Sequence, residues 1–184
     1  HMSRFIEIVQ ADDRQLGPEA VLRMLREMQG RLEAAEARLV LEYPMFMERE
    51  APVSKSKGMI DIDCGFVGLI NGDEIDLVQK AVVTVTSLCP CSKEISDYGA
   101  HNQRGAVTVE VRTRKDEDGT PVTLPMGDLI FAAEESASCR IYPVLKRPDE
   151  RWITMEAYEN PVFVEDMVRG VAERLQADER VASF

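Results

Sequence analysis

Two cysteines, a histidine and several charged side chains lie within one short stretch of the sequence, Thr86–Arg104. The side chains with chemical potential are Cys89, Cys91, Lys93, Glu94, His101 and Arg104. A thiolate and an imidazole are good ligands for divalent transition metals, and cationic side chains attract anionic groups. The stretch therefore predicts metal-assisted chemistry on an anionic substrate.

The strands on either side of this stretch decide how firmly its side chains are held. Residues Glu74–Leu88 form a long strand pattern that is apolar on both faces near Val83, which is typical of a central strand. Residues Ala106–Arg112 alternate as a second strand, with the valines on one face. Cys89 directly follows the central strand, so we expect its position to be well fixed.

The remaining elements are predicted from periodicity, proline and turn signals. They are a short helix over Ser3–Gln10, a helix that begins at Gly17-Pro18 with an apolar stripe of Val21, Leu25, Met28 and Leu32, a strand over Arg38–Phe46, a polar connection over Glu48–Lys57, a strand over Gly58–Ile70, a turn at Asn71-Gly72-Asp73, a charged turn over Lys115–Pro121, a helix over Pro125–Cys139, and a last helix capped by Asn160 with Pro161 at its first position and a stripe of Val164, Met167, Val168, Val171 and Leu175.

This order, two helices and two strands followed by two strands and two helices, predicts an α+β fold with helices on one face of antiparallel sheets. The two halves mirror each other around Asn71-Gly72-Asp73, which predicts an N-terminal module over residues 1–70 and a C-terminal module over residues 74–184. Each half would be a ββααββ unit if one more hairpin preceded residue 1 and another followed Phe184. Both sheets would otherwise keep open edges, so we expect a truncated chain or completion by partner subunits.

Composition narrows the function classes. The chain has 184 residues, 45% of them hydrophobic, and a net charge of −11, so it has no general attraction for nucleic acid or for an anionic membrane. No apolar run approaches the roughly 20 residues of a membrane span. The four cysteines then suggest a reducing, cytoplasmic location rather than disulfides, with Cys64 and Cys139 as small buried hydrophobes.

Four segments resemble one known family, GTP cyclohydrolase type IB, and the resemblance runs essentially end to end. The segments are residues 1–5, the Cys-Pro-Cys-Ser-Lys-Glu-Ile-Ser and Gly-Ala-His-Asn-Gln-Arg strings within Thr86–Arg104, Ala137–Cys139 through Lys146–Glu150, and Ala157–Pro161 with Phe163–Asp166. The resemblance implies a tandem tunnelling fold, with two ββααββ modules per chain, assembled into a homotetramer with sites near subunit interfaces. The family's opening hairpin and closing segment have no counterpart between His1 and Phe184.

The implied reaction converts GTP and water into 7,8-dihydroneopterin triphosphate and formate, the first step of tetrahydrofolate and related pterin biosynthesis. By resemblance, Cys89, His101 and Glu150 hold one divalent metal ion, with Cys89 and His101 as catalytic residues. Zinc, manganese and iron all suit a thiolate, an imidazole and a carboxylate. Cys91 is expected to support the site, although a Cys-x-Cys pair also occurs in structural metal sites.

Substrate recognition needs an acceptor for guanine and cations for the triphosphate. By resemblance Glu165, in the first turn of the last helix, is the guanine anchor. Lys93, Arg104, Lys146 and Arg147 lie close to the matched motifs and could build a local positive pocket, while Asn102 and Gln103 could bind ribose or phosphate oxygens. The steps after ring opening need further acids and bases that the residues do not assign.

Two other functions stay open from the sequence. One is the tunnelling-fold nitrile reductase of queuosine synthesis, which would use its cysteine as a covalent nucleophile and consume NADPH. The other is a structural metal-binding module built on Cys89 and Cys91 that helps assembly. Metal-dependent release of formate from GTP separates all three.

Overall fold

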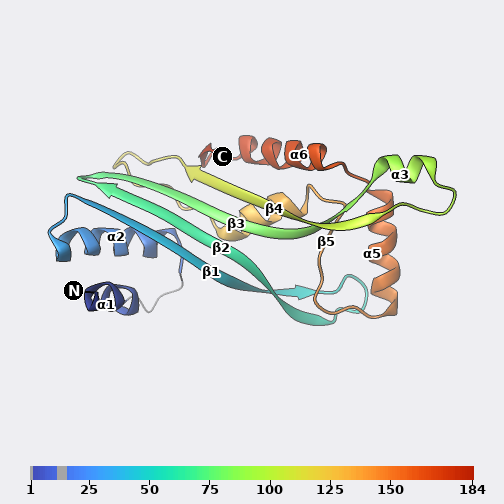
Figure 1. Ribbon diagram of the computed structural model, residues 1–184, viewed down its shortest axis with the longest axis horizontal. Coiled ribbons are helices and arrows are strands. Elements are labelled where there is room, and N and C mark those ends of the chain that lie inside the picture. Colours follow the sequence, from blue (N-terminus) through green and yellow to red (C-terminus); the bar gives the residue numbers. More distant parts are fainter. Residues whose placement is uncertain (1, 12–15) are drawn as a thin grey trace.

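The computed structural model describes residues 2–11 and 16–184, so His1 of the first matched segment lies outside the described residues. In chain order its elements are α1 Ser3–Ala11, α2 Pro18–Leu32, β1 Glu36–Glu50, β2 Lys57–Asn71, β3 Glu74–Leu88, α3 Pro90–Ile95, β4 Asn102–Thr113, α4 Met126–Glu134, β5 Cys139–Arg140, α5 Arg147–Glu159, α6 Val164–Ala177 and β6 Val181–Ser183. Figure 1 shows three long strands, β1 to β3, running the length of the molecule.

The strands form one antiparallel sheet in the order β1-β2-β3-β4-β6, with the short β5 paired to β3. β1 and β2 pair along their whole length, from Glu36↔Asn71 to Glu50↔Lys57. The predicted α+β class and the central position of Glu74–Leu88 are confirmed. The predicted boundary between residues 70 and 74 falls in the β2–β3 turn, where Gly72 has a φ of 58°. The division into two modules stays a prediction.

One face of the sheet carries the core. Buried residues alternate with exposed ones along β2 and β3, so Ile62, Cys64 and Phe66 point to the core while Asp61 and Asp63 do not. Val21, Leu25 and Met28 of α2 belong to the same buried cluster as residues of α4 and α6, which places these helices over that face. Burying a side chain such as that of Leu25, 0% exposed, is worth about 1.5–3 kcal/mol.

Glycine lets the first of these helices approach the sheet closely. A Cβ atom at Gly68 of β2 would lie 2.5 Å from Cδ1 of Leu25 and 3.3 Å from Cγ1 of Val21. A side chain at residue 68 would therefore force the side chain of Leu25 to move from its place between α2 and the sheet. The short spacing explains why the α2 stripe predicted from the sequence is buried almost completely.

Several predicted boundaries are wrong, and pairing or capping explains each difference. The Glu48–Lys57 connection is shorter because β1 and β2 pair as far as Glu50↔Lys57. The strand expected from Ala106 begins at Asn102, which pairs with Leu88. The helix expected over Pro125–Cys139 ends at Glu134, because the chain then turns so that Cys139 pairs with Thr86.

The last two helices also differ from the prediction. The matched segment Lys146–Glu150 forms the start of α5, a helix that was not predicted. Asn160 ends that helix rather than capping the next one, and its side chain donates to the carbonyls of Ala137 and Ser138. α6 begins at Val164, and only Met167, Val171 and Leu175 of its predicted stripe are buried. Val164 and Val168 are exposed.

A buried glutamine interrupts the core. Gln79 of β3 is 1% exposed, and within the described residues neither its Nε2 nor its Oε1 has a hydrogen-bond partner. An unpaired buried polar group costs about 1–3 kcal/mol. We expect Gln79→Leu to raise the free energy of unfolding by about that amount, measured by urea denaturation. The same change at exposed Gln176 should leave stability unaltered, and a less stable Gln79→Leu protein would contradict the prediction.

Candidate active site

The backbones of Cys89 and His101 lie side by side where the pairing of β3 and β4 ends, next to the segment that contains α3. The preceding pair in the strand register is Leu88↔Asn102, and the amide of Cys89 donates to the carbonyl of His101 at 3.1 Å. The two residues predicted to act together are therefore immediate backbone neighbours. β3 holds this point firmly, because the amide of Leu88 also donates to Oγ of Ser138 at 2.9 Å.

Ser92 joins the two residues by three hydrogen bonds. Its amide donates to Sγ of Cys89 at 3.5 Å, its Oγ donates to the carbonyl of Cys89 at 3.0 Å, and that Oγ accepts from the amide of His101 at 3.1 Å. The sequence interpretation did not single out Ser92. The available signal was the helix start at Cys89-Pro90, since proline favours the first helical position and a capping side chain precedes it.

The surroundings of Cys89 favour its thiolate. Its sulfur caps the N-terminus of α3, and the hydrogen bond from the backbone amide of Ser92 is the largest cause that lowers the pKa of this thiol. Cys64 and Cys139 behave in the opposite way, because burial raises the pKa of each thiol to about 11. The prediction that these two are buried small side chains is confirmed.

A small hollow lies beside the end of the β3–β4 pair at which Cys89 and His101 are found. Its volume is about 160 Å³, and Asn102 and Arg104 of β4 line it together with Thr86, the segment after Cys139 and the middle of α5. Both Asn102 and Arg104 are exposed, as are Gln103 and Cys91. The structure therefore brings two of the predicted substrate-binding residues to one concave surface next to Cys89 and His101, the pair predicted to be catalytic.

Lys93 and Glu165 lie in different helices, α3 and α6. The ammonium of Lys93 donates to the carbonyl of Tyr158 and lies 4.2 Å from the centroid of the Tyr158 ring, so it ties α3 to the end of α5. Glu165 is exposed in the first turn of α6, as expected. Their roles in substrate binding stay predictions.

Glu150 lies elsewhere in the chain. It is in the first turn of α5, whereas Tyr158, which contacts α3, is in the last turn, roughly 12 Å further along the helix axis. Lys146 and Arg147 stand at the same first turn and are exposed. Figure 1 shows α5 standing across the end of the sheet, with α3 beside one end of it.

The metal site predicted from the sequence is assembled only in part within one chain. Cys89 and His101 are donors of suitable type at one point, and the environment of Cys89 favours the charged form that binds metals. Among residues 2–11 and 16–184, however, no three histidine, cysteine or acidic side chains are arranged to hold one ion. Within the part of the chain that the structure describes, no third protein donor joins the pair.

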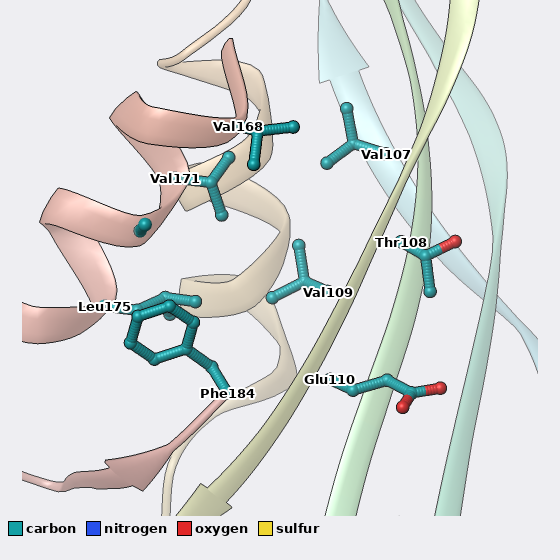
Figure 2. Close-up of a pocket in the computed structure, with 9 residues that line it drawn as sticks. Val107, Thr108, Val109, Glu110, Val168, Val171, Leu175 and Phe184 are labelled. Carbon is teal, nitrogen blue, oxygen red and sulfur yellow. The ribbon is translucent and has the colours of Figure 1, made fainter. Parts of the chain in front are cut away.

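A larger hollow lies away from these residues. It measures about 420 Å³ and lies between α6, β4 and Phe184. Figure 2 shows Val168, Val171 and Leu175 of α6 facing Val107 and Val109, while Thr108 and Glu110 point away from the helix. Its lining is apolar on the helix side, and its polar lining residues are Thr108 and Glu110.

Comparison with known proteins gives a consistent result. A family model described as type I GTP cyclohydrolase folE2 matches residues 1–184. GTP cyclohydrolase FolE2 of Nitrosococcus oceani is 48% identical over 184 residues, which are all of this chain and 66% of that protein. GTP cyclohydrolase FolE2 of Nitrosomonas eutropha is 45% identical over 185 residues, covering 100% of this chain and 67% of that protein. The chain thus spans about two thirds of the length of these relatives. In the described residues no helix is both long enough and apolar enough to cross a membrane.

Proposed function

The chain belongs to the FolE2 family of type I GTP cyclohydrolases, and from this premise we propose that it hydrolyses GTP to 7,8-dihydroneopterin triphosphate and formate. The observation that carries the proposal is the Cys89–His101 pair, held by Ser92 at the end of a central strand within a chain that the family model matches throughout. The product would enter tetrahydrofolate synthesis.

The pair supplies the first chemical requirement. Opening the imidazole ring of guanine needs an activated water, and a divalent metal ion supplies that by lowering the pKa of bound water. The thiolate of Cys89 and the imidazole of His101 would hold such an ion, and Cys91, two residues from Cys89, would support them. Zinc, manganese and iron fit these donors equally well.

Glu150 is proposed as the third donor in an assembled enzyme. Because α5 keeps Glu150 away from Cys89 in the single chain, the carboxylate would come from a neighbouring copy. This agrees with the tandem tunnelling fold and homotetramer that we propose for the complete cytoplasmic protein. Sedimentation of the protein with and without metal tests the assembly, and a stable monomer that turns over GTP would contradict it.

The substrate would lie along the hollow beside the pair. Asn102 and Arg104 line it, and Gln103, Lys93, Lys146 and Arg147 are proposed to contact ribose or phosphate oxygens. Such cations act on an otherwise acidic protein, so their effect is local and should weaken with salt.

Glu165 is proposed to anchor guanine through its N1–H and 2-amino donors. Glu165→Gln replaces one acceptor oxygen by a donor, so we expect the KM for GTP to rise roughly 10–100-fold, the equivalent of one or two charge-assisted hydrogen bonds. Steady-state kinetics measure this, with inosine triphosphate as a competing substrate. Asp166→Asn, which alters the neighbouring acid paired with Arg169, is the matched control and should keep the parent KM. Equal KM values for Glu165→Gln and the parent would remove Glu165 from the guanine site.

The activity itself is tested by metal add-back. The protein is stripped with a chelator, zinc, manganese and iron(II) are returned one at a time, and formate and the fluorescent oxidised pterin are measured with GTP. Formate release that depends on metal supports the proposal. Consumption of NADPH with a nitrile substrate would indicate the reductase, and metal binding without either reaction would indicate a structural module; the family match favours neither alternative.

A further inference from the structure

A buried carboxylate connects the start of α5 to a distant part of the chain. Asp149 is 0% exposed. Its Oδ1 accepts from the amides of Val53 at 2.9 Å and Ser54 at 2.8 Å, and its Oδ2 accepts from the amide of Lys146 at 2.8 Å. Val53 and Ser54 lie at the tip of the β1–β2 hairpin, so one side chain joins the two segments.

These contacts suit a permanent anion. Burial alone would raise the pKa of Asp149, but hydrogen bonds from Ser54 and from the amides of Lys146 and Val53 outweigh it and hold the pKa well below its usual range. A carboxylate held in this way neither gives nor takes a proton near neutral pH. Asp149 therefore acts through the geometry that it imposes.

A second contact fixes the same segment independently. A Cβ atom at Gly58 of β2 would lie 2.8 Å from Cγ2 of Val144 and 2.9 Å from Cγ of Pro143. The chain leading into α5 thus lies directly against the backbone of β2. Any side chain at residue 58 would displace this chain without touching Asp149.

The opposite end of α5 contacts α3 and the end of β3, the elements next to the proposed catalytic pair. Lys93 of α3 holds the carbonyl of Tyr158, and Ala157 is buried in a small cluster with Leu88 and Cys139. Figure 1 shows the result: α5 runs from the β1–β2 tip to α3. The hairpin of the N-terminal half and the Cys89 loop of the C-terminal half are therefore joined by one helix.

We propose that Asp149 is a positioning residue that fixes Lys146 and Arg147 against the β1–β2 hairpin tip, so that both cations are held where they bind the triphosphate of GTP. This inference rests on the proposed function for its substrate. It assigns the β1–β2 tip, which carries no predicted site residue, a part in building the phosphate subsite.

The test compares ligand affinities, measured by calorimetry, in the parent and in Asp149→Asn. Guanosine lacks the phosphates, so the ratio of GTP affinity to guanosine affinity reports the phosphate subsite. We expect this ratio to fall about tenfold or more, as for loss of one charge-assisted contact, while guanosine affinity stays the same. The double variant Asp149→Asn with Arg147→Ala should lower the affinity ratio no further than the more damaging single change does, because both changes act on the same contact with the triphosphate.

Two further variants separate positioning from folding. Asp128→Asn removes a first-turn acid of α4 that pairs with Arg180, so it should lower stability without changing the affinity ratio. Gly58→Ala moves the segment through Val144 and should lower the ratio as Asp149→Asn does. If Asp149→Asn does not fold, Gly58→Ala carries the test.

Hydrogen exchange of the amides of Val53, Ser54 and Lys146 shows whether their hydrogen bonds to residue 149 are lost in a variant. Faster exchange with a reduced affinity ratio supports the proposal. Faster exchange with the parent ratio overturns it, and so does a fall in GTP and guanosine affinity together. If the parent binds GTP but releases no formate with any metal, the proposed function fails while the affinity ratio still decides the role of Asp149. If the parent protein binds GTP and guanosine with equal affinity, there is no phosphate subsite and the proposal is overturned.

Discussion

Cys89→Ala is expected to abolish GTP turnover while the protein stays folded. The change removes the thiolate that we propose as a metal donor, and losing about 4 kcal/mol of transition-state stabilisation lowers kcat/KM roughly a thousandfold. The structural cost is small, because the hydrogen bond from the Ser92 amide to the sulfur is long, at 3.5 Å, and losing a cap costs about 1 kcal/mol. Formate release and thermal unfolding measure the two effects separately.

The control variants for Cys89 follow from its neighbours. Cys64→Ala removes a buried thiol far from His101, so it should lower stability and leave kcat unchanged. Ser92→Ala keeps both donors but removes the hydroxyl that links them, and its activity should lie between those of the parent and Cys89→Ala. Parent-level turnover by Cys89→Ala with added metal would show that the thiolate has been assigned the wrong role.

Arg49→Met is expected to give the largest loss of stability, about 3–5 kcal/mol. Arg49 and Glu134 form a buried ion pair with 2.6 Å between Nη2 and Oε1, and both side chains are less than a tenth exposed. Removing the cation leaves the carboxylate of Glu134 buried, with Arg140 at 3.8 Å from Oε2 as its remaining partner. Urea denaturation measures the loss.

A double variant and a surface pair test the cause of this loss. Arg49→Met with Glu134→Leu removes both charges and should recover much of the stability, because apolar side chains can replace a buried ion pair. Lys57→Met breaks an exposed pair of 2.8 Å with Glu48 and should cost less than about 1 kcal/mol. A loss of similar size for Lys57→Met and Arg49→Met would show that burial of the pair is unimportant.

The pH dependence of the Arg49→Met variant has a definite sign. Burial raises the pKa of Glu134 even in the parent, and Arg49 is the largest cause that lowers it again. Without Arg49 the pKa rises further in the folded state, so the folded protein binds a proton more tightly than the unfolded chain. The loss of stability of Arg49→Met relative to the parent should therefore be smaller below the ordinary pKa of glutamate. It should grow as the pH rises through the pKa of Glu134 in the folded variant. A deficit that does not change with pH would contradict this account.

Long periodic elements of the fold were predictable from the sequence. α2, β2 and β3 follow from apolar spacing, because each presents one continuous face to the core. β6 has no such signal, since three residues carry no period and its pairing with Arg112 and Thr113 is a tertiary effect.

The relative placement of the candidate site residues was predictable where they are close in sequence. Cys89 and His101 were expected to act together, and the register of β3 with β4 makes them neighbours. The separation of Glu150 from Cys89 was not predicted, because no helix was expected over residues 147–159. Signals for that helix were present in Pro148 at an early helical position and in the acids of the first turn.

The attachment of α5 at both ends limits how this protein can change in length. One residue inserted between Asp149 and Tyr158 would rotate everything beyond it by about 100° and advance it by about 1.5 Å. Asp149 and the contact with Lys93 could then not both be satisfied. The turn at 115–120 is largely exposed, and hydrogen bonds between Asp116 and residues 118–120 lie within the turn itself. We therefore expect insertions and fused peptides to be tolerated better there than in α5, whose length is fixed by contacts at both ends.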